Sequence, residues 1–253
     1  MGAATDLAMA LDRVAFARSA GIEADDWQAK ALRSDASRQL YNCSRQSGKS
    51  TIAGILAVHT ALYDPDSLVL LLSPTLRQSQ ELFRKALSVY RSAGRSVPPE
   101  SETALTLTLS NGSPIVGLPG KEGTIRGYSD VHMLVMDEAS RVEDALYFAV
   151  RPMLAVSGGS LVMLSTPFGK RGVFHREWTE GEGWERFEVP ATEVPRISPE
   201  FLEEERKALG PWWYAQEYEC RFMETDDAVF THEVVERAIT DEVKPLFVGG
   251  GLG

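Results

Sequence analysis

The segment from Cys43 to Thr51 constrains the fold most, because it places the sequence Gly-Lys-Ser between an apolar strand and a helix. Residue patterning predicts the strand over 38–43 and the helix over 50–62. In a phosphate loop, consecutive backbone N–H groups point into one concavity at the N-terminus of a helix. The segment therefore predicts a nucleotide phosphate site, whose expected residues are Ser44, Arg45, Gln46, Ser47, Gly48, Lys49, Ser50 and Thr51.

Three residues of this loop fit separate roles. Gly48 belongs to the backbone cradle, Lys49 reaches the β and γ phosphates, and the Ser50 hydroxyl is a ligand for Mg²⁺. The general phosphate-loop pattern has a glycine five residues before Gly48, where this chain has Cys43. The alternative is a chance Gly-Lys-Ser at a helix start, which the flanking strand and helix disfavour.

The composition is that of an ordinary globular chain. With 253 residues, 43% of them hydrophobic, it can bury the core of one large domain, or of one domain with a small appendage. Its 26 basic and 36 acidic residues give a net charge of −10, which argues against a surface that coats nucleic acid non-specifically. A local basic track for DNA is compatible with this charge. Cys43 and Cys220 form neither a disulfide framework nor a recognisable metal cluster.

No segment has the length of a membrane span. The longest apolar runs, at 68–72 and 161–164, are of strand length. Residues 5–20 carry charges at a helical period, which favours an amphipathic helix over a secretory signal. We therefore expect no membrane association and a cytoplasmic location.

Apolar strand candidates alternate with helical segments up to Pro167. These strands are predicted at 38–43, 68–73, 131–136 and 160–165. The alternation predicts an α/β domain on a mostly parallel sheet. In addition, segments 104–109 and 113–118 meet across Asn111-Gly112, which is a hairpin signal and is expected at a sheet edge.

The sequence changes character after Pro167, where it becomes charged, aromatic and mostly helical, with several prolines. We expect three regions. These are a P-loop core with N-terminal helices over 1–169, a small lid or linker subdomain over 170–232, and a tail or the start of a further domain over 233–253.

The strand at 131–136 runs directly into Asp137 and Glu138. The carboxyl ends of the strands are where α/β sheets place ligands, and neighbouring strand residues point to different sides. Asp137 is therefore predicted to hold Mg²⁺ together with Ser50, and Glu138 to orient the water that attacks the γ-phosphate. A solvated acidic turn is the alternative, which the phosphate loop disfavours.

Two polar motifs are less specific. Ser165 and Thr166 precede Pro167 at the end of a predicted strand and are candidates to sense the γ-phosphate, although a plain turn explains them equally well. Trp27 and Gln28 precede the first strand and are candidates to hold adenine by stacking and by amide hydrogen bonds. The alternative is an amphipathic helix whose tryptophan packs in the core, which is the commoner case.

Two arginines are candidates for transition-state stabilisation. Arg126 lies in the loop 120–128 before the carboxylate strand, and Arg45 lies in the phosphate loop. An arginine delivered to the γ-phosphate of a neighbouring subunit offsets the charge that develops during hydrolysis. A solvated surface arginine is the alternative for either residue.

Together, the motifs resemble the ATPase domain of the large terminase subunit of tailed bacteriophages and related viruses. The similarity covers about residues 25–232 and is more specific than any single motif. The matching segments are the phosphate loop at 44–50, which lacks the leading glycine as in a terminase variant, the arginine segment at 124–129, the carboxylate segment at 136–140, and the segments 164–168 and 214–222.

The resemblance implies a RecA-like additional-strand P-loop NTPase that uses ATP and Mg²⁺ to move double-stranded DNA into a procapsid. Such a motor acts in the host cytoplasm as a homo-oligomeric ring on a portal protein, with a small terminase subunit; an isolated domain can be a monomer. By this resemblance Gln28 falls on the adenine position, Lys49 on the phosphate position and Ser50 on the Mg²⁺ position. Asp137 falls on the metal-binding carboxylate and Glu138 on the catalytic carboxylate. Ser165 and Thr166 fall on the coupling motif. Arg126 is the preferred trans-acting arginine and Arg45 the alternative.

The C-terminus departs from this family. Large terminase subunits continue into a nuclease domain of the RNase H type, whose first strand carries a metal-binding aspartate. This chain has Gly251 at the aligned position. Because two-metal cleavage needs several carboxylates, we expect an Mg²⁺-dependent ATPase without nuclease activity, with 233–253 as a tail or the start of a missing nuclease domain.

Two other functions stay open. A helicase would need a second RecA-like domain, and the sequence after Thr166 is too short to form one. A nucleotide-dependent assembly module would use ATP only to set subunit contacts. Lys121, Lys170 and Arg171 are candidate DNA contacts, because each lies in a loop at the edge of the predicted core.

Overall fold

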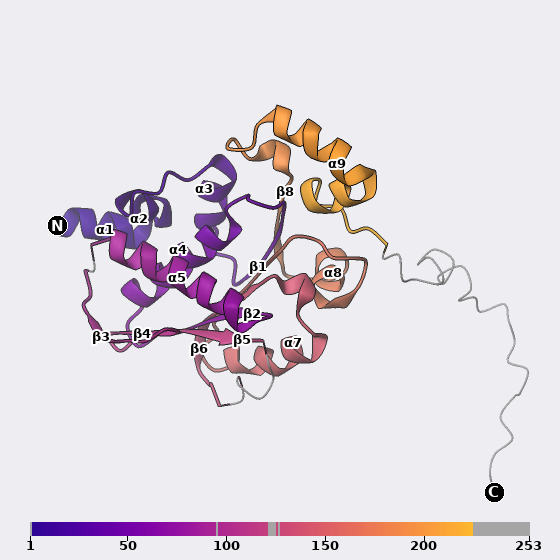
Figure 1. The fold of residues 1–253 in the computed structure, drawn as a ribbon. Coiled ribbons are helices and arrows are strands. Elements are labelled where there is room, and N and C mark those ends of the chain that lie inside the picture. Colours follow the sequence, from indigo (N-terminus) through magenta and orange to yellow (C-terminus); the bar gives the residue numbers. More distant parts are fainter. Residues whose placement is uncertain (1, 95, 121–124, 126, 225–253) are drawn as a thin grey trace, which may run out of the picture. The chain divides into compact units, whose positions relative to one another are not determined.

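An eight-stranded sheet forms the centre of the protein, with the strand order β3-β4-β5-β2-β6-β7-β1-β8 (Figure 1). The computed structural model describes residues 2–94, 96–120, 125 and 127–224. From β5 to β8 in this order all strands are parallel, whereas β4 is antiparallel to β5 and β3 to β4. The strands are β1 (Arg38–Cys43), β2 (Leu68–Ser73), β3 (Pro99–Glu102), β4 (Thr106–Leu109), β5 (Pro114–Pro119), β6 (Val131–Asp137), β7 (Ser160–Ser165) and β8 (Glu185–Val189).

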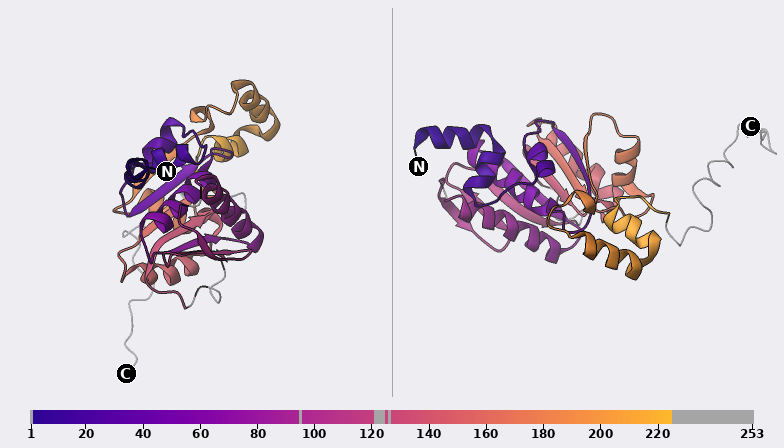
Figure 2. Two further views of the ribbon diagram at one scale, coloured as in Figure 1. Left: turned by 90° about the vertical axis from the view of Figure 1, so that its left-hand side faces the viewer. Right: turned by 90° about the horizontal axis from the view of Figure 1, so that it is seen from above.

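Helices cover both faces of the sheet (Figure 2). Strand side chains alternate between two hydrophobic cores, so Val69 and Leu71 join the core that includes α4 and α5, while Leu70 and Leu72 join the core that includes α7 and α8. Burial on both faces explains why the central strands are apolar throughout. The helices are α1 (Ala3–Leu11), α2 (Arg13–Ser19), α3 (Asp26–Leu32), α4 (Lys49–Tyr63), α5 (Leu76–Ser92), α7 (Asp144–Val150), α8 (Gly172–Thr179) and α9 (Pro199–Tyr218), with the 3₁₀ turns η1 (Ala139–Arg141), η2 (Arg151–Leu154) and η3 (Ala191–Glu193).

The predicted α/β fold is confirmed, including the four parallel strands and the hairpin. In the hairpin, β4 and β5 pair across Asn111-Gly112, and Gly112 adopts a φ of +85°, which favours glycine. The outermost strand on this side is β3, beyond the hairpin. Its residues Pro99–Glu102 are exposed throughout, so the apolar alternation that marks most strands is missing.

The prediction of one N-terminal helix over residues 5–20 was wrong. The segment forms two helices, α1 and α2, which are separated at Asp12. Asp12 has extended backbone, and its carboxylate accepts a hydrogen bond from the backbone N–H of Val14 at 2.9 Å. This N-cap satisfies a donor at the start of α2 and thereby favours the break.

The sequence after Pro167 contributes to the sheet as well as to peripheral helices. Strand β8 pairs with β1 in parallel, with Gln39 opposite Glu185. Helix α9 is interrupted at Gly210, whose φ is +73°, immediately before Pro211. The described residues up to Met223 group into one compact unit, and residues 225–253 lie outside the described residues. The division at residues 169 and 232 stays a prediction.

No helix in the described part of the chain is long and apolar enough to cross a membrane.

Candidate active site

The phosphate loop connects β1 to α4 in a fixed conformation. Gly48 has a φ of +94° and precedes the first residue of α4, and Gln46 also lies in the left-handed region. The N–H of Ser44 donates to the carbonyl of Val189 at 2.9 Å, and the N–H of Arg45 to the carbonyl of Glu217 at 3.1 Å. Strand β8 and helix α9 therefore hold the start of the loop.

The remaining loop N–H groups are available for a ligand. In the described residues, the N–H groups of Gln46, Ser47 and Gly48 donate to no backbone carbonyl. At the start of α4, the N–H groups of Thr51 and Ile52 donate to the Gly48 carbonyl, whereas those of Lys49 and Ser50 have no backbone partner in the helix. The side chains of Ser44 and Ser47 are buried, so this run of N–H groups is the part of the loop that can bind an anion.

Gln28 lies behind the loop rather than in the pocket. Its side-chain N–H₂ group donates to the carbonyl of Ser47 at 3.5 Å, and its amide oxygen accepts from the N–H of Asp25 at 3.0 Å in a capping box. Arg196 donates to the same Ser47 carbonyl at 2.9 Å. Gln28 thus braces the phosphate loop, and its contact with adenine stays a prediction. Trp27 packs in the core.

The sheet brings the loop and the carboxylates together. Strand β6 ends at Asp137, and Glu138 turns the chain with a φ of +50°. Lys49 Nζ lies 3.3 Å from Glu138 Oε1 and 3.3 Å from Thr166 Oγ1 at the end of β7. Ser50 Oγ lies 3.4 Å from Asp137 Oδ2. These five residues thus form one cluster at the carboxyl ends of β1, β6 and β7, where α/β sheets bind ligands.

Burial and charge set the protonation of this cluster. Burial raises the pKa of Asp137 to about 6, and the Glu138 carboxylate adds to this while Lys49 opposes it. Burial acts to lower the pKa of Lys49, but Glu138 and Asp137 outweigh it and raise that pKa above its usual value. Lys49 therefore carries its positive charge at neutral pH.

The Ser50 and Asp137 side chains fit a magnesium ion. Both present oxygen atoms, the ligand type that Mg²⁺ prefers, and burial together with the Glu138 charge raises the pKa of Asp137, an effect that a bound cation would oppose. In the described residues, no group of three or more His, Cys, Asp or Glu side chains could hold a metal ion. Mg²⁺ needs no such group, because it usually binds one or two carboxylates, several waters and substrate phosphates.

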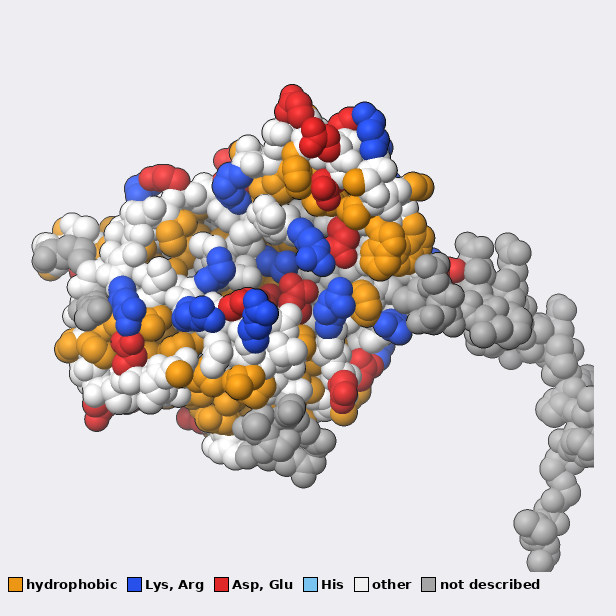
Figure 3. All heavy atoms as spheres, in the orientation of Figure 1, with side chains coloured by type: hydrophobic (Ala, Val, Ile, Leu, Met, Phe, Trp, Pro, Cys, Tyr) orange, Lys and Arg blue, Asp and Glu red, His pale blue; other side chains and the backbone are white. Residues whose placement is uncertain are grey.

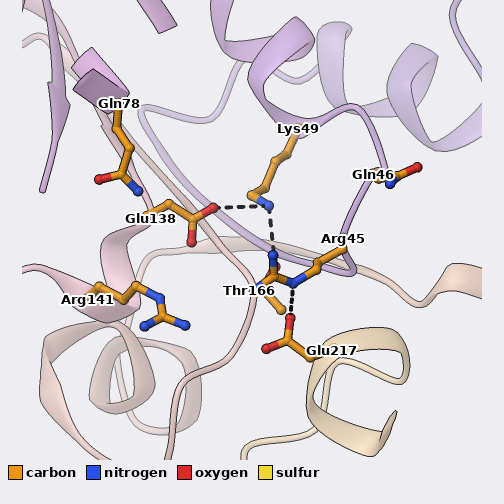
Figure 4. Close-up of a pocket in the computed structure, with 8 residues that line it drawn as sticks. All are labelled: Arg45, Gln46, Lys49, Gln78, Glu138, Arg141, Thr166 and Glu217. Carbon is orange, nitrogen blue, oxygen red and sulfur yellow. Dashed lines mark hydrogen bonds and ion pairs between the residues drawn. The ribbon is translucent and has the colours of Figure 1, made fainter. Parts of the chain in front are cut away.

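A pocket of about 490 Å³ opens beside this cluster (Figure 4). Its lining is mostly charged or polar and comes from the phosphate loop, α4, α5, η1 and α9, and from the loop after β7: Arg45, Gln46, Lys49, Gln78, Glu138, Arg141, Thr166 and Glu217. The molecular face in Figure 3 shows Lys and Arg side chains gathered around a smaller group of Asp and Glu side chains. Positive side chains therefore gather on this face even though the chain as a whole is negatively charged.

The two candidate arginines differ in what the structure shows. Arg45 lines the pocket of its own chain and forms an ion pair with Glu217 of α9. Arg126 lies outside the described residues, as do Lys121 and Gly251. Thr51 faces a different cavity, which Ile22 and Lys85 also line. The roles predicted for these residues stay predictions.

A hydroxyl that sequence reasoning missed connects the segment after β6 to Ser165 and Thr166 at the end of β7. Ser140 Oγ lies 2.6 Å from Ser165 Oγ and donates to the Thr166 carbonyl at 2.8 Å, while the Ser140 N–H donates to Ser165 Oγ at 3.2 Å. Gln78, Arg141 and Glu217 were also not predicted as pocket residues. For Ser140 and Glu217 the available signal was their position inside the segments 136–140 and 214–222.

Comparison with known proteins assigns the family. A family model described as "Terminase large subunit, T4likevirus-type, N-terminal" matches residues 40–237, which is more than half of the chain. The chain belongs to this terminase family. The resemblance found in the sequence is thereby confirmed.

The curated relatives of this terminase chain are large terminase subunits of phages. The large terminase subunits of Thermus virus P23-45 and Thermus phage G20c are each 23% identical to it over 235 residues. Each match covers 79% of this chain and 48% of the relative. The chain therefore spans about half the length of the curated relatives it matches.

Solved terminase structures share the fold. The large terminase ATPase domain of Thermus phage P74-26 superposes with a TM-score of 0.74 at 24% identity, covering 82% of this chain and 97% of that domain. The large terminase of thermophilic bacteriophage D6E in complex with ATP-γ-S gives a TM-score of 0.62 at 14% identity, covering 79% and 53%. S. cerevisiae Dbp5 bound to RNA and ADP BeF3 gives 0.52 at 16%, covering 72% and 51%, which reflects the RecA-like core.

Proposed function

We propose that this terminase chain is an Mg²⁺-dependent ATPase. The observation that carries the proposal is the cluster of Lys49, Glu138, Thr166, Ser50 and Asp137 beside the phosphate loop. It combines a cation for phosphate, oxygen ligands for a metal and a carboxylate for water, which are the parts that phosphoryl transfer to water requires. Structures of the D6E relative with ADP and with ATP-γ-S support a nucleotide as the ligand.

In this mechanism, the loop N–H groups and the N-terminus of α4 bind the phosphates. Lys49 offsets the negative charge that develops on the γ-phosphate, and Glu138 orients and polarises the attacking water. The 3.3 Å contact between Lys49 and Glu138 supports a role for both groups at one reacting centre. When bound between Ser50 and Asp137, Mg²⁺ would neutralise phosphate charge. Thr166 contacts Lys49 and would report the phosphate state to the loop after β7.

We further propose that the ATPase drives double-stranded DNA into a procapsid in the host cytoplasm. Family membership supports this function, and the basic side chains on the face of Figure 3 support a polyanionic partner. The motor would act as a homo-oligomeric ring with a portal protein and a small terminase subunit. In the ring, Arg126 would reach the γ-phosphate of the neighbouring subunit, with Arg45 as the alternative.

The test is steady-state ATP hydrolysis against protein concentration, with and without double-stranded DNA. Glu138→Gln should abolish turnover and leave ATP binding, because the amide keeps the shape of the side chain but polarises water poorly. Glu143→Gln is the matched control, since Glu143 is an exposed acid that follows Glu138 closely in the chain, at the start of α7. The control should hydrolyse ATP at the wild-type rate.

The concentration dependence tests the assembly. A specific activity that rises with protein concentration, and that is lost in Arg126→Ala, would support hydrolysis between subunits. A constant specific activity that Arg126→Ala leaves unchanged would contradict the role of Arg126. Nucleotide binding without hydrolysis under any of these conditions would favour the assembly module instead.

A further inference from the structure

Arg141 is placed beside Glu138 by the local backbone. The chain leaves β6 at Glu138 and forms the 3₁₀ turn η1, in which the N–H of Arg141 donates to the carbonyl of Glu138 at 2.9 Å. The Arg141 and Glu138 side chains both line the pocket (Figure 4).

The three cations that line the pocket differ in their partners. Lys49 is paired with Glu138, and Arg45 is paired with Glu217. Within the described residues, no carboxylate lies within ion-pair distance of the Arg141 guanidinium, and that guanidinium donates no hydrogen bond to a side chain or carbonyl. Arg141 can therefore take an anionic ligand without breaking an existing ion pair.

Phe168 holds the Arg141 side chain in place. The guanidinium carbon lies 3.9 Å from the centroid of the Phe168 ring, and Phe168 comes three residues after Ser165 at the end of β7. Stacking uses the flat face of a guanidinium and leaves its N–H donors in the plane free, with the geometry that suits phosphate oxygens. Because this stacking limits the side chain's rotation, less conformational entropy is lost when a ligand binds.

We propose that Arg141 is a catalytic residue that contacts the terminal phosphate of the nucleotide bound to its own chain, and that Phe168 is the residue that positions it. The inference rests on the proposed ATPase function and extends it. Arg141 adjoins Glu138, the residue that serves the attacking water, so its contact is with the phosphate at this end of the nucleotide. The proposal therefore predicts discrimination between a nucleoside triphosphate and a diphosphate.

The experiment measures binding of ADP and of ATPγS to the full chain by calorimetry, together with steady-state ATP hydrolysis. Arg141→Ala should raise the dissociation constant for ATPγS or lower kcat by about tenfold or more, because a charge-assisted hydrogen bond to phosphate is lost. The dissociation constant for ADP should stay within about twofold. Arg141→Lys, which keeps the charge but lacks the planar fork, should fall between wild type and Arg141→Ala.

Arg151→Ala is the matched control, because Arg151 also is exposed and lies over an aromatic ring, that of Tyr147, but does not line the pocket. It should leave both dissociation constants and kcat within about twofold of wild type. Phe168→Leu should weaken ATPγS binding less than Arg141→Ala does. If Phe168 acts through Arg141, the double variant should be no weaker than Arg141→Ala alone.

An Arg141→Ala chain with unchanged ATPγS affinity and kcat would overturn the inference, as would an equal loss of ADP and ATPγS affinity. Additive losses in the double variant would overturn the role of Phe168. A wild-type chain that binds neither nucleotide would overturn the proposed function, and this inference with it. Normal wild-type hydrolysis together with an unaffected Arg141→Ala variant would overturn the inference alone.

Discussion

Removal of the Ser140 hydroxyl should reduce both stability and turnover. The hydroxyl takes part in two hydrogen bonds, one with Ser165 Oγ at 2.6 Å and one with the Thr166 carbonyl at 2.8 Å. At about 0.5–1.5 kcal/mol each, Ser140→Ala should lower the free energy of unfolding by about 1–3 kcal/mol. Because Ser140 ties the turn after Glu138 to Thr166, which contacts Lys49, kcat should fall about tenfold to a hundredfold.

The assay pairs urea unfolding with steady-state ATP hydrolysis, and Ser157→Ala is the matched control. Ser157 Oγ donates to the Val131 carbonyl at the opposite end of β6 and accepts from the N–H of Gly159 at 3.2 Å. The control should lose a similar amount of stability and keep its kcat. Ser140→Thr, which retains a hydroxyl, should recover most of the turnover.

The reasoning would be refuted if Ser140→Ala lost stability while its kcat matched that of Ser157→Ala. That result would mean that the bonds between the two segments support the fold and do not align the reacting groups. A kcat restored by Ser140→Thr would exclude a general loss of folded protein as the cause of the defect.

Two further predictions concern the loop and the core. Gly48→Ala should destabilise the protein by more than about 1–2 kcal/mol, the cost of a positive φ for a residue with a side chain. The new Cβ would lie 2.5 Å from Nε2 of the buried Gln28, which would have to move away from the Ser47 carbonyl that it contacts. Gly183→Ala, with a φ of +75° and nothing within 4 Å, isolates the backbone cost in the same unfolding assay. Burial lowers the pKa of His59 to about 4, so the folded state favours neutral imidazole, and stability present above pH 6.5 should be lost as pH falls towards 4. Between pH 7.5 and 4.5 the free energy of unfolding should fall by about 2–3 kcal/mol because of His59. His59→Gln should remove this component of the pH dependence. An equal pH dependence of stability in the wild type and in His59→Gln would contradict its assignment to His59.

Contiguous motifs made the centre of the site predictable. Residues 44–50 and the pair Asp137-Glu138 are each continuous in sequence and follow predicted strands. Parallel strands present their carboxyl ends at one edge, so the two motifs and the strands before them predict that Lys49 and Glu138 lie at the same edge of the sheet. The structure has this arrangement, with 3.3 Å between the two charged groups.

The residues that were missed depend on contacts between distant segments. Glu217 reaches the pocket from α9 through its bonds with Arg45, and sequence pattern gives no measure of such packing. Ser140 is one of many serines near a turn, and only the close approach of β6 and β7 gives its hydroxyl a partner. Strand β8 did carry a sequence signal, since the apolar residues Phe187 and Val189 alternate with charged ones, but the run is only five residues long.

The pairing of β8 with β1 has a consequence for how the chain is made. Strand β1 lies between β7 and β8, and the Val189 carbonyl accepts the first hydrogen bond of the phosphate loop, from Ser44. A chain emerging from the ribosome therefore carries β1 with both edges unpaired until β7 has been synthesised, and with one edge unpaired until β8 follows. Such an edge can pair with other chains. Nucleotide affinity should consequently appear late in synthesis, and fragments that end before β8 should be prone to aggregation.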